Sequence, residues 1–221
     1  MKKAFLLAAS IFGIIVLSFG QAKKAKPGYY YDKQGNKVEG QFVFKIPIEG
    51  SIGGEGKLIE YKGGKKEQTL KAKDIEAFVL EGDSFPSLTF MSEIMGSRDL
   101  ETEFGKIIIE GEITVAALYY TKKNGGSRVV YDKEDFNKQG KMMSLAMSHG
   151  LTFANVYKKG ANGQYSQFDP YIKKAKEKFI MDISDNSELS KEVSKMGKMK
   201  LAMKFTEVVQ RYNKWASSKS K

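Results

Sequence analysis

The sequence predicts an α+β protein, in which an antiparallel β-meander, either a strongly curled sheet or a small open barrel, is followed by C-terminal helices that pack on it. Two observations carry this prediction. Short β-rich segments alternate with glycine-containing turns as far as Tyr131, and helical periodicity then takes over toward the C-terminus. Strands first and helices last is the order typical of the α+β class.

The N-terminal residues 1–22 have the pattern of a cleavable signal peptide. Two lysines precede an apolar run over residues 4–19, and Gly20 and Ala22 place small residues before the cleavage site. The run is shorter than the roughly 20 residues that a membrane-spanning helix needs. We therefore expect an exported chain, periplasmic or secreted, that begins at Lys23 after cleavage and has no transmembrane segment.

The chain contains no cysteine. Exported proteins usually meet an oxidising compartment in which disulfides persist, so the stability of this chain must come from packing alone. The lack of cysteine also excludes cysteine nucleophiles and cysteine zinc sites. Hydrophobic residues make up 41% of the chain, which indicates a folded domain and not a disordered one.

The region 23–135 is predicted to be the antiparallel β region, because it contains four hairpin signals. Each signal consists of two β-rich segments on either side of a short turn that contains glycine. The paired segments are 29–31 with 37–44, 57–61 with 67–71, 75–80 with 84–90, and 113–120 with 128–131. A further strand is expected at 106–109, where β-branched residues run together.

Three consecutive tyrosines lie in the first of these strands. Strand alternation places Tyr29 and Tyr31 on one face and Tyr30 on the opposite face. The three tyrosines are a candidate patch for sugar stacking or adhesion, and at least one of the two faces is expected to be core.

The region 136–221 is predicted to be mainly helical and to form one domain with the β region. A first helix is expected within 133–147. Asp169 followed by Pro170 is typical of a helix start, and Asp185 with Glu188 three residues later resembles a capping box.

The clearest helical stripe lies near the C-terminus. Its apolar residues recur at the spacing of one helix face: they are Leu201, Phe205, Val208, Val209, Tyr212 and Trp215. We expect this stripe to dock on the β-sheet, with the lysines of the same helix facing solvent.

Positive charge is concentrated in the last quarter of the chain. The whole chain has a formal net charge of +11; residues 171–221 hold 13 Lys/Arg and 6 Asp/Glu, a net of +7. A basic surface of this kind attracts anionic lipid, polysaccharide or an acidic partner protein, or it only solvates the helices. The candidate basic face consists of Lys200, Lys204, Arg211 and Lys214. Nucleic acid is not expected as a partner of an exported chain, and no cofactor is implied.

Two other function classes stay open. The first is a carboxylate-based hydrolase acting on an envelope glycan, because Glu101 and Glu103, or Glu110 and Glu112, would share a strand face. The second is a copper-binding protein. Met142, Met143, Met147 and His149, the only histidine, cluster in the sequence, and thioether with imidazole suits Cu(I).

The methionines also have a simpler interpretation. Met fills irregular gaps in helical cores, and Met196, Met199 and Met203 recur at helical spacing. This interpretation predicts that the methionines are buried.

Several segments together resemble a broad group of small exported proteins of unknown function that are common in Bacteroidota. The resemblance is carried by Gly28-Tyr29 and by residues 35–41, 74–78, 104–111 and 205–213. It is a pattern of hydrophobic and turn positions and contains no catalytic motif. The chain departs from the group by lacking the cysteine often found before the last helices, where Asn186-Ser187 lies here. The resemblance implies export and no established activity.

The function that the sequence favours is therefore non-enzymatic. We expect an exported envelope binding or interaction module whose basic helical face contacts an anionic surface or a partner.

Overall fold

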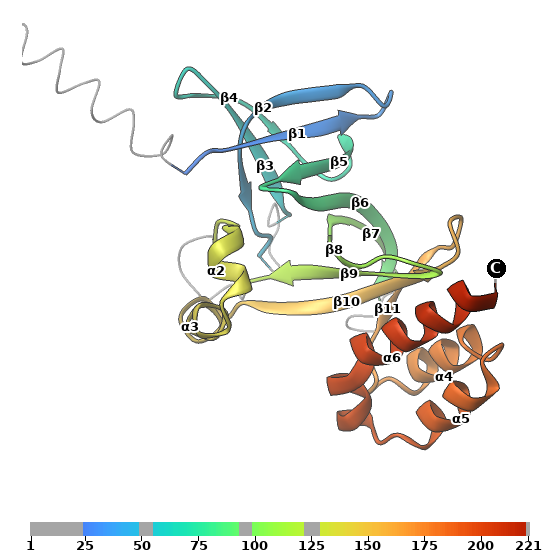
Figure 1. Ribbon diagram of the computed structural model, residues 1–221. Helices are drawn as coiled ribbons and strands as arrows, with labels where there is room; N and C mark the ends of the chain where they lie inside the picture. Colours follow the sequence, from blue (N-terminus) through green and yellow to red (C-terminus); the bar gives the residue numbers. More distant parts are fainter. Residues whose placement is uncertain (1–23, 49–54, 93–98, 122–128, 220–221) are drawn as a thin grey trace, which may run out of the picture. The chain divides into compact units, whose positions relative to one another are not determined.

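The computed structural model describes residues 24–48, 55–92, 99–121 and 129–219 (Figure 1). The predicted signal peptide and the turn at Asn124-Gly125 lie outside these ranges. The described part contains eleven strands, mostly antiparallel, and helices that follow them at the C-terminus. The α+β class predicted from the sequence is confirmed.

The chain divides into two compact units. The first contains the residues up to Ser84 together with Thr121–Leu151, and the second contains Phe85–Tyr120 together with Thr152–Lys221. Each unit combines strands with helices from a later part of the chain.

In the first unit, five antiparallel strands follow the order β4-β3-β2-β1-β5. They are β1 (Lys26–Asp32), β2 (Lys37–Lys45), β3 (Lys57–Lys62), β4 (Lys65–Leu70) and β5 (Ile75–Leu80). The pairs β1–β2 and β3–β4 are the first two predicted hairpins. Two helices complete the unit, α2 (Lys133–Asn137) and α3 (Gln139–His149).

The predicted curled sheet or small open barrel is wrong, because the strands follow an open order and the sheet is neither closed nor curled. In the first unit β4 and β5 stand at opposite ends of that order. The exposed residues Lys65, Lys66 and Glu67 belong to the end strand β4. Charged side chains on an end strand disfavour further pairing, which explains why the order stops there.

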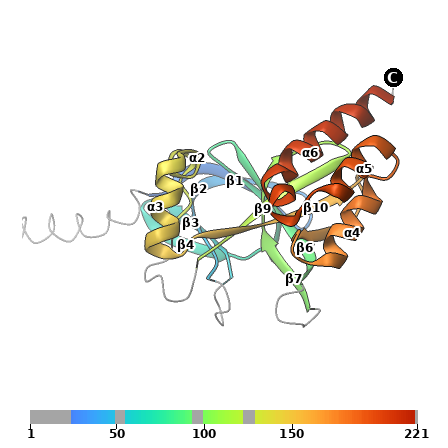
Figure 2. The same ribbon diagram turned by 90° about the horizontal axis from the view of Figure 1, so that it is seen from below.

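In the second unit, six strands follow the order β7-β6-β11-β10-β9-β8, in which only β6 and β11 are parallel neighbours. They are β6 (Asp83–Ser92), β7 (Asp99–Phe104), β8 (Lys106–Ile109), β9 (Ile113–Tyr120), β10 (Thr152–Lys159) and β11 (Tyr165–Phe168). Strands β10 and β11 lie in the region that was expected to be mainly helical. The helices are α4 (Lys173–Asp182), α5 (Ser187–Lys195) and α6 (Lys198–Lys219), which lie side by side (Figure 2).

The fourth predicted hairpin is wrong. β9 pairs with β8 on one side and with β10 on the other, so both of its edges are occupied. Residues 129–131 instead continue beside the end of β2, where the Ile46 N–H donates to the Val129 carbonyl and the Tyr131 N–H donates to the Phe44 carbonyl, both at 2.9 Å.

The core of the second unit confirms the predicted stripe of α6. Leu201, Phe205, Val208, Val209 and Tyr212 are buried in one cluster with residues of β8–β11, α4 and α5, and Trp215 packs against it partly buried. The ring of Phe205 stacks on Phe168, with centroids 3.8 Å apart and planes 9° from parallel. The stripe therefore docks α6 on the sheet of its own unit.

Candidate functional site

Helices α4 and α5, which lie beside α6, begin within a few residues of the predicted positions. α4 begins at Lys173, three residues after Pro170, because the Asp169 carboxylate accepts from the Tyr171 N–H at 2.8 Å and closes a turn before the helix. α5 is capped by Asn186, whose side-chain oxygen accepts from the Leu189 N–H at 3.1 Å. Asp185 is therefore not the cap of α5.

Asp185 instead belongs to a polar network that joins three elements. The Tyr212 hydroxyl of α6 donates to its carboxylate at 2.8 and 2.9 Å, and the Lys159 ammonium of β10 lies 3.1 Å from it. Lys159 also donates to the Asp182 carbonyl at 2.6 Å, and the Tyr157 hydroxyl donates to the Asp182 carboxylate at 2.7 Å. The network fixes α4 and α6 against β10.

The network shifts the pKa values of its members. Burial by itself would raise the pKa of Asp185, but the hydrogen bonds from Tyr212 and Lys159 outweigh it and hold that pKa below its ordinary value. Burial raises the pKa of Tyr212, and the neighbouring carboxylate of Asp185 adds to this against the opposing effect of Lys159. Both residues therefore keep the charge states that the hydrogen bonds require at neutral pH.

The Asp185→Asn substitution is expected to give a pH-dependent loss of stability. Because the folded-state pKa of Asp185 is depressed, its stabilisation is present above the unfolded-state value of about 3.9 and is lost as the pH falls through the folded-state value. Chemical unfolding should show the wild type more stable than the variant at pH 7, with the gap closing below about pH 4. In a Tyr212→Phe background, which lacks one hydrogen-bond donor to Asp185, the stability difference at pH 7 caused by Asp185→Asn should be smaller. Parallel stability curves at all pH values would contradict the assignment.

Most carboxylates of helices α4–α6 form ion pairs with neighbouring lysines or arginine. Lys173 pairs with Glu177 at 3.7 Å, and Lys178 pairs with Asp182 at 2.7 Å. The other pairs involve residues predicted for the basic face: Lys204 lies 3.0 Å from Glu207, and Arg211 binds Glu192 through both guanidinium nitrogens at 2.7 and 3.0 Å.

The four residues of the predicted basic face therefore divide into two pairs. Lys204 and Arg211 are neutralised by neighbouring carboxylates, whereas Lys200 and Lys214 are exposed and have no ion-pair partner within the described ranges. The hydrogen bond from Arg211 lowers the pKa of Glu192, with smaller contributions from Lys200 and Lys204.

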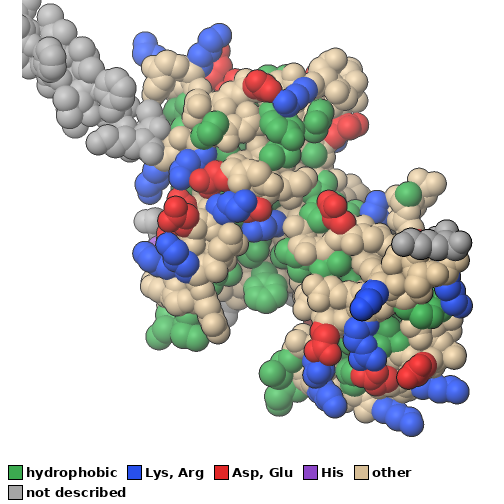
Figure 3. All heavy atoms as spheres, in the orientation of Figure 1, with side chains coloured by type: hydrophobic (Ala, Val, Ile, Leu, Met, Phe, Trp, Pro, Cys, Tyr) green, Lys and Arg blue, Asp and Glu red, His purple; other side chains and the backbone are tan. Residues whose placement is uncertain are grey.

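Further exposed lysines of α4 and α5 were missed by the sequence reasoning. Lys174, Lys191 and Lys195 are exposed, and none of them forms an ion pair in the part of the chain that the structure describes. In Figure 3, basic side chains gather on the visible surface of this helical part, with acidic side chains between some of them.

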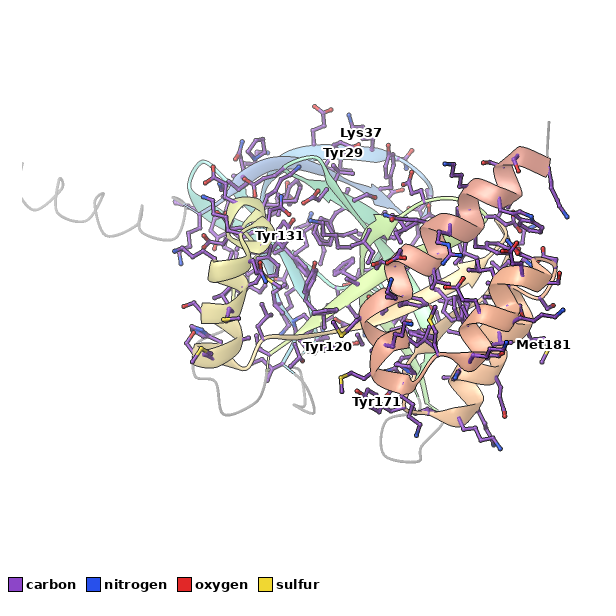
Figure 4. All side chains as sticks on the ribbon, turned by 60° about the horizontal axis from the view of Figure 1, so that its bottom comes forward. Tyr29, Lys37, Tyr120, Tyr131, Tyr171 and Met181 are labelled. Carbon is purple, nitrogen blue, oxygen red and sulfur yellow. The ribbon has the colours of Figure 1, made fainter. Side chains whose placement is uncertain are left out.

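The methionines of α6 do not fill a core. Met199 and Met203 are 67% and 79% exposed, and the nearby Tyr171 is 58% exposed. Figure 4 shows Tyr171, and Met181 of α4, on the outside of the helical part. Of Met196, Met199 and Met203, only Met196, just before α6, is buried as the core interpretation predicted. The exposed methionines lie on α4 and α6, which also carry lysines without an ion pair in the described ranges, and Tyr171 lies in the turn before α4.

The proposed copper ligands of α3 lie on two sides of the helix. Met143 and Met147, four residues apart, are 60% and 84% exposed, while Met142 and His149 are half-buried and seven residues apart on another face. His149 Nδ1 lies 2.7 Å from the Ser148 hydroxyl. Across the described residues there is also no group of three or more His, Cys, Asp or Glu side chains that could hold a metal ion.

The carboxylate pairs considered for hydrolysis have different surroundings. Glu110 and Glu112 are exposed near the turn between β8 and β9, and Glu103 of β7 is buried. The side chain of Glu101 lies outside the described part.

The tyrosines of β1 alternate as predicted. Tyr30 is buried, and the rings of Tyr29 and Tyr31 meet edge to face on the other side with centroids 5.5 Å apart. The Lys37 ammonium lies 4.3 Å from the centroid of the Tyr29 ring, and Figure 4 shows the two side by side. A sugar that stacked on this face of Tyr29 would first have to displace Lys37.

Comparison with known proteins gives no relative for this chain: no family model, curated protein or solved structure matches it. The resemblance to exported Bacteroidota proteins therefore stays a prediction. Within the described residues, none of the helices combines the length and the apolar character needed to span a bilayer.

Proposed function

We propose that this protein is an exported, non-enzymatic binding module that attaches through helices α4–α6 to an anionic surface of the cell envelope. The proposal depends on the unequal pairing of charges on these helices. The carboxylates of Glu177, Asp182, Glu192 and Glu207 are held by nearby cations. The exposed lysines of α4–α6 without such a partner in the described ranges are Lys174, Lys191, Lys195, Lys198, Lys200, Lys214 and Lys219.

Unpaired lysines are suited to this role because their field extends into solvent. A dense anionic surface interacts with several of them at once, whereas an ion pair within the protein has a much weaker external field. The lysines lie on exposed helix surfaces, where a reactant would not be enclosed, and this favours binding over catalysis. The signal-peptide pattern of residues 1–22 supports export to a compartment where anionic lipids and glycans are accessible.

Reversal of two unpaired charges should weaken binding without affecting folding. The Lys200→Glu, Lys214→Glu variant should bind both phosphatidylglycerol vesicles and immobilised dextran sulfate roughly tenfold more weakly at low salt. Binding of the wild type should itself decline as salt rises, since exposed charges are screened. Thermal unfolding should be nearly unchanged, because neither lysine has an ion-pair partner in the described part.

The matched control is Lys62→Glu with Lys66→Glu, which makes the same change in net charge on exposed strand residues of the first unit. This control should bind both probes to within about twofold of the wild type. The proposal would be contradicted if the wild type bound neither probe at low salt. It would also be contradicted if the two charge-reversal variants lost the same amount of binding.

A further inference from the structure

The first turns of α6 present two methionines to solvent between lysines. Met199 and Met203 lie four residues apart, so their side chains are neighbours on one helix face, and they are 67% and 79% exposed. Lys198 and Lys200 flank Met199 in the sequence and are also exposed. This surface combines apolar and positively charged side chains.

Tyr171 extends the same surface. The Lys198 ammonium donates to the Tyr171 carbonyl at 3.4 Å, which places the start of α6 beside the turn before α4, and the Tyr171 side chain is 58% exposed. We call Tyr171, Lys198, Met199, Lys200 and Met203 the α6 patch. Lys198 and Lys200 form no ion pair within the described ranges, and the N-terminus of a long helix adds partial positive charge at this place.

We infer that the anionic surface is a phospholipid bilayer, and that the α6 patch binds it with Met199 and Met203 entering the headgroup region while the lysines contact lipid phosphates. This inference rests on the proposed function and names its ligand. Apolar side chains beside lysines are the composition of segments that lie in a membrane interface. A tyrosine is favoured at the same depth, because its ring is apolar and its hydroxyl reaches water.

A polysaccharide would use the lysines but not the methionines. A hydrated glycan offers no apolar phase into which thioether side chains can transfer, so two exposed methionines contribute nothing to such a complex. Acyl chains and the headgroup boundary do offer one. The methionines therefore distinguish a bilayer from a glycan as the ligand.

Helix α3 provides a natural comparison within the same chain. Its Met143 and Met147 have the same spacing and similar exposure, at 60% and 84%. The lysines near them are paired, Lys138 with Glu134 at 3.3 Å and Lys141 with Asp135 at 3.9 Å. We expect no comparable lipid affinity there, because exposed methionines without unpaired positive charge lack the attraction to anionic headgroups.

The test uses a Met199→Ser, Met203→Ser variant and the matched control Met143→Ser, Met147→Ser. Binding is measured by co-sedimentation with phosphatidylglycerol vesicles and by retention on dextran sulfate. The α6 variant should bind vesicles roughly tenfold more weakly and dextran sulfate as the wild type does. The α3 variant should match the wild type with both probes. Because all four methionines are exposed, both variants should fold normally, which circular dichroism checks.

A second measurement reports insertion directly. In a Met203→Trp variant made in a Trp215→Phe background, the single tryptophan lies at position 203. Its emission should move to shorter wavelengths when vesicles are added and should not move with dextran sulfate.

Different results would overturn the bilayer as the ligand and the proposed binding function. If the charge-reversal variant loses binding but the α6 methionine variant retains full vesicle binding with no emission shift, the anionic surface is not a bilayer and the inference is overturned, while the proposed function stands. If the wild type binds neither probe at low salt, the proposed function itself is overturned. Equal losses in the α3 and α6 variants would show non-specific adsorption and would also overturn the inference.

Discussion

Phe205→Ala is expected to destabilise the second unit by about 3–5 kcal/mol, as large-to-small changes in well-packed cores do. Phe205 is buried and stacks on Phe168, and its ring also meets Tyr157 and Phe179 with centroids 6.2 and 5.1 Å away. Truncation would leave a cavity lined by three aromatic rings from β10, β11 and α4. Rigid rings cannot collapse into such a space without changing the positions of the elements that hold them, so much of the lost contact energy is not recovered.

The measurement is urea unfolding followed by the fluorescence of Trp215, the only tryptophan, which packs against the same cluster and so reports on this unit. The control is Met203→Ala, two residues earlier on α6 but 79% exposed. It should change the free energy of unfolding by less than about 0.5 kcal/mol. Equal effects of the two substitutions would mean that α6 is not docked through Phe205.

Gly111→Ala is expected to cost about 2–4 kcal/mol, through backbone strain and disrupted hydrogen bonds. Gly111 has φ +152°, and an added Cβ would lie 2.4 Å from Nδ2 and 2.6 Å from Cγ of Asn213 on α6. That amide clamps the start of β9: its oxygen accepts from the Ile113 N–H at 2.8 Å, and its nitrogen donates to the Ile113 carbonyl at 2.8 Å. An alanine at this position would push the amide away and leave both backbone groups of Ile113 without their partner.

Two comparisons separate the collision from the strain. Gly160 also has a positive φ, +73°, but nothing lies within 4 Å of an added Cβ, so Gly160→Ala should cost only about 1–2 kcal/mol. In an Asn213→Ala background the collision is removed, and the cost of Gly111→Ala should fall to a similar value. Equal costs of Gly111→Ala and Gly160→Ala would show that the added Cβ does not displace the Asn213 amide from Ile113.

Part of the candidate surface could be predicted from local spacing. Lys204 has an acidic residue three positions later, Glu207, and the two form the ion pair that this spacing favours. Lys200 and Lys214 have no acidic residue three or four positions away, and both are unpaired within the described ranges. The partner of Arg211 could not be found in this way, because Glu192 belongs to a different helix and is 19 residues distant.

The burial of the methionines also could not be predicted from the sequence. Met196 and Met199 are three residues apart and equally apolar, yet the first is buried and the second is exposed. Composition alone could not distinguish them. The side of α6 that docks is set by its continuous stripe of large apolar residues, and Met199 and Met203 lie outside that stripe.

Four features could be predicted from the amino-acid sequence: the class of the fold, the two hairpins of the first unit, the alternation of Tyr29 to Tyr31 and the buried face of α6. These features follow from periodicity and turn chemistry within short segments. The folded chain was needed to find that β9 pairs with β10, that Asp185 binds Tyr212 and Lys159, and which lysines and methionines are exposed. These outcomes depend on which strand edges, carboxylates and surfaces are occupied by segments distant in the sequence. The spacing of residues within a short segment does not contain that information.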